Sequence, residues 1–142
     1  MKKGVQLGKY RFGKQLSEGG HCEVWKGWDT IENIWVALKI PHVQMNGQRD
    51  NQSILNEVRL VYQLRHPNIF PVKNVEIIDG YTVLASELST GTLDDCSEPM
   101  SVRRILAIMI SVLEGLKCAH KNRIVHCDVT PGNIFLFPDN HV

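Results

Sequence analysis

The segment IVHCDVTPGNIFLF, residues 124–137, carries polar side chains that could do chemistry within an apolar stretch. Asp128 lies five residues before Asn133, and Pro131 and Gly132 lie between them. Both polar side chains carry oxygen, and proline stiffens the loop that holds them. Such a pair could orient a hydroxyl group and bind Mg²⁺, a hard cation that prefers oxygen ligands. A plainer interpretation is an Asx turn that connects a helix to a strand.

A second group of candidate residues lies in the N-terminal half. The segment LSEGGHCEVW, residues 16–25, places small residues between two predicted strands, where backbone N–H groups could approach phosphates. An ordinary hairpin tip is the alternative. Lys39 lies among apolar strand residues, and Glu57 lies on the apolar face of a predicted helix. A carboxylate there is costly unless it is paired, so Lys39 could reach Glu57 and also hold phosphate oxygens. The alternatives are a surface lysine and a boundary glutamate.

The elements that must position these residues begin with short strands. Residues 9–16, 22–29 and 34–40 are predicted to form an antiparallel meander joined by short turns. Residues 70–78 and 81–88 flank an Asp-Gly pair, which is typical of a hairpin.

Two helices are predicted from apolar periodicity. In the first, from about residue 52 to 64, Ile54, Glu57, Val58 and Val61 share one face. The second runs from about Val102 to His120 after a loop, with Ser101 as its cap. That helix is apolar nearly all round, so we expect it to be buried on several sides.

Composition limits the classes of protein to consider. The chain has 142 residues, 43% of them hydrophobic and 22% charged, with a formal net charge of +1. This balance gives no reason to expect nucleic acid or an anionic membrane as partner, and no apolar run approaches the ~20 residues that span a bilayer. The start has no secretory signal pattern. The four cysteines form no C-x-x-C pair, which fits a reducing, cytoplasmic location.

The order of these motifs is more specific than any one of them. A small-residue loop, a strand lysine in VALK, a helix glutamate 18 residues later and the loop HCDVTPGN match the protein-kinase signature set. From about Tyr10 to Val142 the sequence resembles the eukaryotic-type (Hanks-type) serine/threonine protein kinase family. The resemblance implies an α+β, protein-kinase-like fold. Residues 1–88 would form the small lobe, an antiparallel sheet plus one helix, and residues 89–142 a linker, long helix and catalytic loop of a partial helical large lobe.

The resemblance also implies a role for each matching residue. Asp128 would accept the proton of the substrate hydroxyl, Lys39 would bind ATP phosphates and pair with Glu57, and Asn133 would bind Mg²⁺. His126 would hold the catalytic loop. The residues expected to bind ATP are Leu16, Ser17, Glu18, Gly19, Gly20, Val24, Ala37, Lys39, Ser86, Glu87, Ser89, Asn133 and Leu136.

Within that set the resemblance separates the phosphate site from the adenine site. The loop from Ser17 to Val24 would cover the phosphates. The adenine would lie among Leu16, Val24, Ala37 and Leu136. Ser86 would be a small gatekeeper residue, and Glu87 and Ser89 would belong to the hinge that binds adenine through its backbone.

Several positions depart from the family pattern. Ser17 and Cys22 stand where the first and third loop glycines are usual, which should weaken nucleotide binding. Cys127 replaces the arginine that usually precedes the catalytic aspartate, so we expect no switch through a phosphorylated activation segment. Thr130 replaces a lysine. A hydroxyl supplies no positive charge, so stabilisation of the transition state should suffer, and the acceptor class is less sharply defined.

The last departure is that the sequence stops at Val142, before the position of the D-F-G motif. Three hypotheses stay open. The chain is an ATP-dependent kinase that phosphorylates Ser or Thr of a protein substrate, a catalytically dead nucleotide-binding or scaffolding pseudokinase, or a truncated fragment without a function of its own. Because the long helix would expose apolar surface, we also expect self-association or pairing with a missing large-lobe segment.

Overall fold

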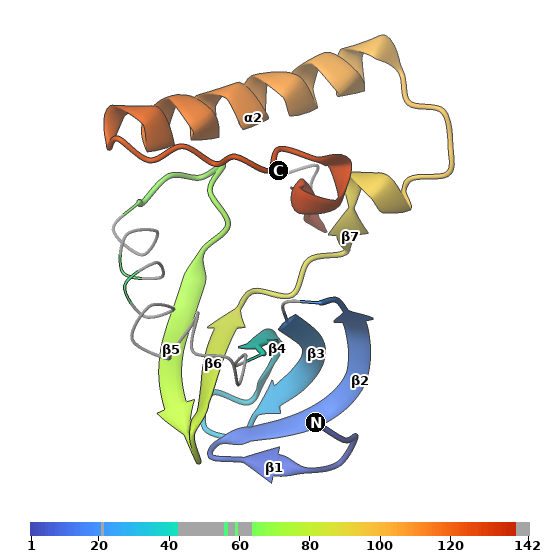
Figure 1. Cartoon of the computed structure of the whole chain (residues 1–142). Helices are drawn as coiled ribbons and strands as arrows, with labels where there is room; N and C mark the ends of the chain where they lie inside the picture. Colours follow the sequence, from blue (N-terminus) through green and yellow to red (C-terminus); the bar gives the residue numbers. More distant parts are fainter. Residues whose placement is uncertain (21, 43–55, 57–58, 60–63, 139–142) are drawn as a thin grey trace. The chain divides into compact units, whose positions relative to one another are not determined.

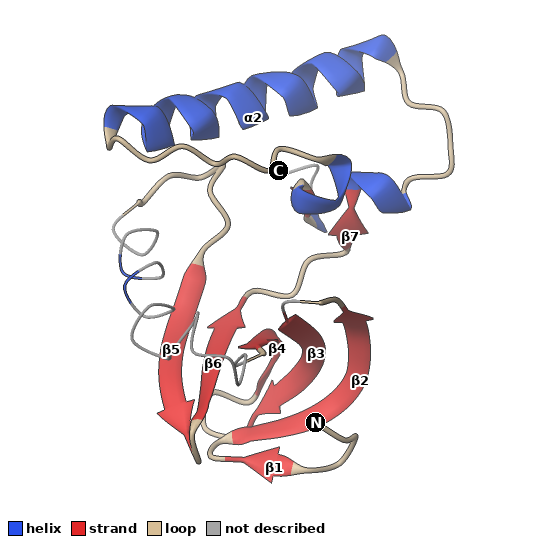
Figure 2. Ribbon diagram, viewed as in Figure 1, coloured by secondary structure: helices blue, strands red, loops and turns tan. Residues whose placement is uncertain are grey.

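The computed structural model describes residues 1–20, 22–42, 56, 59 and 64–138. The chain divides into two compact units. The first unit comprises residues 1–62 and 71–88, and the second comprises residues 63–70 and 89–142. Each unit is described by itself below, and Figures 1 and 2 show the path of the chain through both.

The first unit is built on a curled, six-stranded antiparallel sheet (Figure 2). Its strand order is β1-β2-β3-β4-β6-β5, so the first four strands are sequential neighbours. The strands predicted at 9–16, 22–29, 34–40, 70–78 and 81–88 are confirmed within two residues at each end. The bounds are β1 (Gln6–Leu7), β2 (Tyr10–Glu18), β3 (Cys22–Asp29), β4 (Ile34–Pro41), β5 (Val72–Ile78) and β6 (Tyr81–Ser86).

Alternating apolar side chains form the core on one face of this sheet. Leu38, on β4, has no exposed surface, and its side chain occupies the space that a Cβ on Gly27 would fill. The strands therefore pack around a glycine at this point. The buried core consists of Leu7, Tyr10, Phe12, Trp25, Val36, Leu38, Ile40, Val83 and Ala85.

Asp79 and Gly80 make the predicted turn between β5 and β6. Both have positive φ, 50° and 82°, the conformation that a two-residue type I′ hairpin turn requires. The turn pairs Ile78 with Tyr81 and fixes the register of the two strands. That register brings Ser86, at the end of β6, opposite Ala37 on β4.

A polar network ties the start of β2 to the end of β3. Lys9 Nζ lies 2.9 Å from Asp29 Oδ2, and Asp29 is buried. Burial raises the pKa of Asp29, but hydrogen bonds from Lys9 and from the amides of Glu32 and Ile31 lower it further, so the net pKa is below its usual value. The hydrogen bond to Asp29 likewise raises the pKa of Lys9. Both shifts favour the charged pair.

The second unit is built around the helix α2 (Val102–Lys121), which confirms the predicted long helix. The Ser101 hydroxyl accepts a hydrogen bond from the Arg104 amide and caps the helix. Ile108, Gly115 and Ala119 are its buried residues. None of the helices in the described ranges is long and apolar enough to cross a membrane.

The linker before α2 contains more structure than the predicted loop. β7 (Gly91–Thr92) and the short 3₁₀ helix η1 (Leu93–Asp95) occupy it. The Asp95 carboxylate accepts hydrogen bonds of 2.7 Å from both the Thr92 amide and the Thr92 hydroxyl. These hydrogen bonds lower the pKa of Asp95. A second 3₁₀ helix, η2 (Pro131–Asn133), and β8 (Phe135–Leu136) follow α2.

The helix predicted from residue 52 to 64 is described at three positions. Asn56 and Arg59 are helical, and Leu64 lies outside the helix. Glu57, the expected partner of Lys39, lies outside the described residues.

Candidate active site

The loop between α2 and β8 brings Asp128 and Asn133 together. Asn133 Nδ2 donates a 2.8 Å hydrogen bond to Asp128 Oδ2 and a 3.0 Å hydrogen bond to the Asp128 carbonyl oxygen. Pro131 begins η2, and the Asn133 amide donates to the Thr130 carbonyl oxygen at 3.0 Å. The fixed φ of proline and this turn therefore hold Asn133 over the aspartate.

This geometry sets the orientation of both side chains. Because Asn133 Nδ2 donates to Asp128, the Asn133 carbonyl oxygen is the atom left to bind a cation. Because one Asp128 carboxylate oxygen is occupied, the other can accept a proton from a hydroxyl. Both residues are exposed to solvent. The donor set fits Mg²⁺, which takes amide and carboxylate oxygens as ligands.

The neighbouring residues support this loop. The Asp128 amide donates to His126 Nδ1 over 3.3 Å, as expected for a structural histidine. Cys127, between them, has a φ of 61°, in the left-handed region that non-glycine residues rarely occupy. Strain of this kind is common at functional sites.

The loop that joins β2 to β3 is the candidate phosphate site of the first unit. Ser17 pairs with Val24 and Glu18 with Glu23, and the Gly19 amide donates to the Cys22 carbonyl oxygen at 3.0 Å. A Cβ on Gly19 would meet only that oxygen, at 3.8 Å, and a Cβ on Gly20 would meet nothing within 4 Å. Packing within the described chain therefore does not require these glycines, and the loop leaves open space beside its backbone.

Lys39 lies in fixed register with this loop. It pairs with Val24 on β3 and with Leu84 on β6, and it is exposed. Its neighbour Ala37, half-buried, accepts a 3.4 Å hydrogen bond from the buried Ser86 hydroxyl through its carbonyl oxygen. The sheet thus places a cation beside the loop through backbone pairing alone.

The remaining expected adenine contacts are divided between the units. Leu16 is 46% exposed on β2, and the exposed Glu87 closes the first unit. Ser89 opens the second part of the second unit. There Leu136 pairs with Gly91, and its carbonyl oxygen accepts hydrogen bonds from the Thr90 amide and hydroxyl.

The sequence analysis missed the β7–β8 ladder. It joins the segment that follows Ser89 to the segment that follows Asn133, and Phe70 packs on Phe135 with ring centroids 4.4 Å apart. Strands of two residues have no periodicity that a sequence pattern could detect. The short stretch of apolar residues from 134 to 137 was the available signal.

The sequence analysis also missed two contacts around the β2–β3 loop. His42 Nε2 lies 3.2 Å from the Gly19 carbonyl oxygen. The Met1 ammonium pairs with the Glu23 carboxylate at 3.0 Å, and Trp25 Nε1 donates to the same carboxylate at 2.7 Å. Desolvation raises the pKa of Glu23, but these partners outweigh it and the net pKa is lowered.

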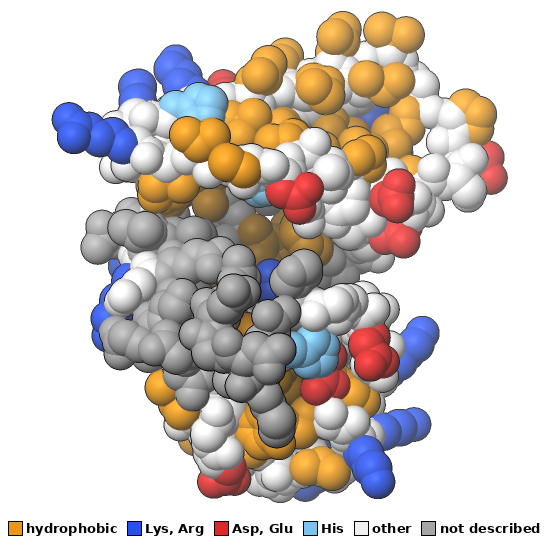
Figure 3. All heavy atoms as spheres, viewed as in Figure 1, with side chains coloured by type: hydrophobic (Ala, Val, Ile, Leu, Met, Phe, Trp, Pro, Cys, Tyr) orange, Lys and Arg blue, Asp and Glu red, His pale blue; other side chains and the backbone are white. Residues whose placement is uncertain are grey.

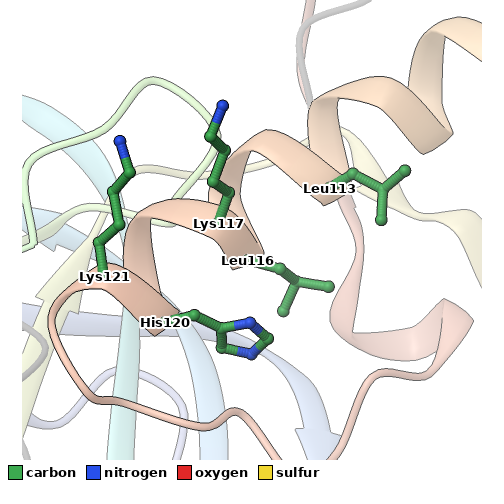
Figure 4. A pocket seen from close by; sticks show the side chains of 5 residues that line it. All are labelled: Leu113, Leu116, Lys117, His120 and Lys121. Atoms are coloured by element: carbon green, nitrogen blue, oxygen red, sulfur yellow. The ribbon is translucent and has the colours of Figure 1, made fainter.

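Two hollows lie on the second unit, away from the predicted ATP-binding residues. One is lined by five residues of α2, from Leu113 to Lys121. Figure 4 shows Lys117 and Lys121 extended side by side, with Leu113, Leu116 and His120 on another side of the helix. The other hollow is lined by Leu93, Asp94, Cys96, Glu98, Met100, Ile105, Ile108, Met109 and Pro131. Neither one has the convergent polar groups of a small-molecule site.

Curated relatives are serine/threonine kinases. RqkA of Deinococcus radiodurans, a DNA damage-responsive serine/threonine-protein kinase, is 32% identical over 138 residues, 91% of this chain and 20% of that protein. PknH of Mycobacterium bovis, a serine/threonine-protein kinase, is 28% identical over 142 residues, 96% of this chain and 24% of that protein. A probable serine/threonine-protein kinase of Dictyostelium discoideum is 28% identical over 136 residues, 93% of this chain and 27% of that protein. The chain therefore spans about a quarter of the length of these relatives.

Solved structures agree on the fold. The crystal structure of the PknI kinase domain of Mycobacterium tuberculosis matches with a TM-score of 0.79 and 24% identity, over 99% of this chain and 60% of that one. This confirms the predicted protein-kinase-like fold. The model of the protein kinase domain family matches residues 10–142. The chain belongs to the protein kinase domain family.

Proposed function

We propose that this chain carries the ATP-binding and catalytic-loop residues of a serine/threonine protein kinase. The reaction is transfer of the γ-phosphoryl group of ATP to a Ser or Thr hydroxyl of a protein. The observation that carries the proposal is the hydrogen bond from Asn133 Nδ2 to Asp128 Oδ2. It holds a carboxylate ready for a hydroxyl proton and leaves an amide oxygen for a metal ion.

Phosphate binding is assigned to the first unit. The open space at Gly19 and Gly20 suits the close approach of phosphate oxygens to backbone N–H groups, with Ser17 and Glu18 on the same loop. Lys39 supplies the positive charge, and Glu57 is proposed to pair with it. In this family such a pair must be in place for transfer.

Adenine binding is assigned to apolar residues and the hinge. Leu16, Val24 and Ala37 of the first unit supply apolar surface. Leu136 of the second unit supplies the other side. Ser86 limits the depth of the site, and its hydrogen bond to Ala37 keeps its hydroxyl from being an unpaired polar group. Glu87 and Ser89 offer backbone groups to the base.

Mg²⁺ is assigned to Asn133, whose amide oxygen is oriented by the hydrogen bond to Asp128. When bound, the metal neutralises charge on the β- and γ-phosphates. Thr130 supplies no positive charge near the transferred group, so we expect slower transfer than in relatives with lysine there. The four free cysteines support a reducing, cytoplasmic location.

Transfer of labelled phosphate from γ-labelled ATP to a generic protein substrate tests this function. Asp128→Asn should lower the rate about 100-fold or more, because the base is lost. Asp94→Asn, at an exposed position on η1, is the matched control and should keep the wild-type rate. Transfer that survives Asp128→Asn would rule out Asp128 as the base.

A second candidate function is a scaffold that works by contact. Apolar side chains gather over α2 (Figure 3). Those more than 40% exposed are Val102, Ile105, Leu106, Met109, Ile110 and Leu113. An apolar surface of this kind is typical of interaction sites, and self-association through it is the simplest form.

Sedimentation velocity across a concentration series distinguishes this candidate. Leu106→Glu, at a side chain 57% exposed, should shift the chain toward monomer. Ile31→Glu, at a turn residue 73% exposed in the first unit, is the matched control and should leave the distribution unchanged. A monodisperse wild-type monomer would contradict self-association.

A further inference from the structure

His42 contacts the tip of the β2–β3 loop from a neighbouring strand. It follows Pro41, the last residue of β4, and its Nε2 lies 3.2 Å from the Gly19 carbonyl oxygen. A carbonyl oxygen only accepts hydrogen bonds, so Nε2 carries the proton and donates. The contact joins positions 23 residues apart in the sequence.

The backbone of both partners is held in place on one side. Cys22 pairs with Pro41 in the β3–β4 ladder, which sets the residue after Pro41 beside the loop. The Gly19 amide donates to the Cys22 carbonyl oxygen at 3.0 Å. The two faces of the Gly19 peptide neighbourhood are thus anchored separately, the amide by the turn and the carbonyl oxygen by the imidazole.

Nothing else in the described chain packs closely on this tip. A Cβ on Gly20 would meet no atom within 4 Å, and residues 17–20 are exposed. A loop with so few neighbours depends strongly on each hydrogen bond it makes. The side-chain bond from His42 is therefore a substantial part of what fixes its position.

We propose that His42 is a positioning residue that holds the β2–β3 loop over the phosphate-binding space through its hydrogen bond to the Gly19 carbonyl oxygen. The inference rests on the proposed ATP site for its functional consequence. An immobilised loop presents its backbone N–H groups at lower entropic cost when phosphates bind. His42 therefore favours ligands that carry phosphates over adenosine, which does not reach the loop.

Two measurements test this role. The first is the exchange rate of the Gly19 amide hydrogen in the nucleotide-free chain, measured by NMR. His42→Leu should raise that rate roughly three- to tenfold, the effect of losing one hydrogen bond. His42→Gln, which keeps an N–H donor, should restore part of the protection. His120→Leu, at an exposed histidine on α2, is the matched control and should not change the rate.

The second measurement compares the dissociation constants of Mg²⁺-ATP and adenosine. His42→Leu should raise that of ATP roughly three- to tenfold and leave that of adenosine unchanged. Unchanged Gly19 exchange, or an equal loss of affinity for both ligands, would overturn the inference. A wild-type chain that binds no nucleotide would contradict the proposed function instead, and the Gly19 exchange rates would still decide the role of His42.

Discussion

Cys127 occupies the most unusual backbone position in the candidate catalytic loop. Its φ of 61° places an L-residue in the left-handed region, at a cost of about 1 kcal/mol. The residue lies between His126, which accepts a hydrogen bond from the Asp128 amide, and Asp128 itself. The turn that positions the carboxylate therefore depends on this strained residue.

Substitution at Cys127 should follow backbone conformation. Cys127→Val should destabilise the chain by about 1–2 kcal/mol, because a β-branched residue tolerates positive φ poorly. Cys127→Gly should be near neutral, since relief of strain offsets the flexibility that glycine adds. Urea unfolding of the two variants measures the difference.

Cys96 provides the matched control. It is also exposed, and its φ is −80°, so the order should reverse: Cys96→Gly should be less stable than Cys96→Val by roughly 0.5–1 kcal/mol. The same order at both positions would show that the left-handed conformation of Cys127 does not decide its tolerance.

Among the elements, α2 is positioned by one close approach to the segment before β5. A Cβ on Gly115 would lie 2.5 Å from the Asn68 backbone oxygen, closer than real contacts allow. Gly115→Ala should therefore destabilise the chain by about 1–3 kcal/mol. In an exposed helix the same change stabilises by about 1 kcal/mol. Glu114→Ala, one position earlier and exposed, should stay within about 0.5 kcal/mol of wild type in thermal unfolding. A stabilised Gly115→Ala variant would contradict this packing.

The pair of Lys9 and Asp29 should make the stability of the first unit depend on pH. The folded pKa of Asp29 is lowered, so its contribution is fully present above the unfolded pKa of about 4. That contribution is lost as the pH falls through the lower folded value. The raised pKa of Lys9 makes its contribution disappear only as the pH rises above the usual lysine range.

Urea unfolding between about pH 5 and pH 2 checks this element. The wild-type free energy of unfolding should fall across this range more steeply than that of Asp29→Asn, which should be less stable at neutral pH. Parallel pH profiles for the two proteins would show that Asp29 does not contribute as its buried ion pair implies.

At the scale of the whole molecule, the sequence predicts the long elements well. β3 was predicted at its observed bounds because alternation over eight residues is a strong signal. The β5–β6 hairpin followed from Asp79 and Gly80, whose turn chemistry is local. The α2 start followed from Ser101, which caps it.

The contacts between distant short segments were not predictable in this way. The β7–β8 ladder and the bond from His42 to Gly19 depend on where the chain returns in space, and no local pattern encodes them. For Asp128 and Asn133 the spacing predicted the chemistry, and the structure adds the direction of the amide, with Nδ2 toward the carboxylate. The family match over residues 10–142 joins these parts into one kinase domain.

The most direct test of the kinase account is a calorimetric titration with Mg²⁺-ATP. The account predicts saturable binding by the wild-type chain and a loss of about 10- to 100-fold in affinity for Lys39→Ala, the value of a charged hydrogen bond to phosphate. Lys73→Ala, at an exposed lysine on β5 of the same unit, should bind as wild type does. Absence of binding by the wild type, or equal affinity of wild type and Lys39→Ala, would contradict the account.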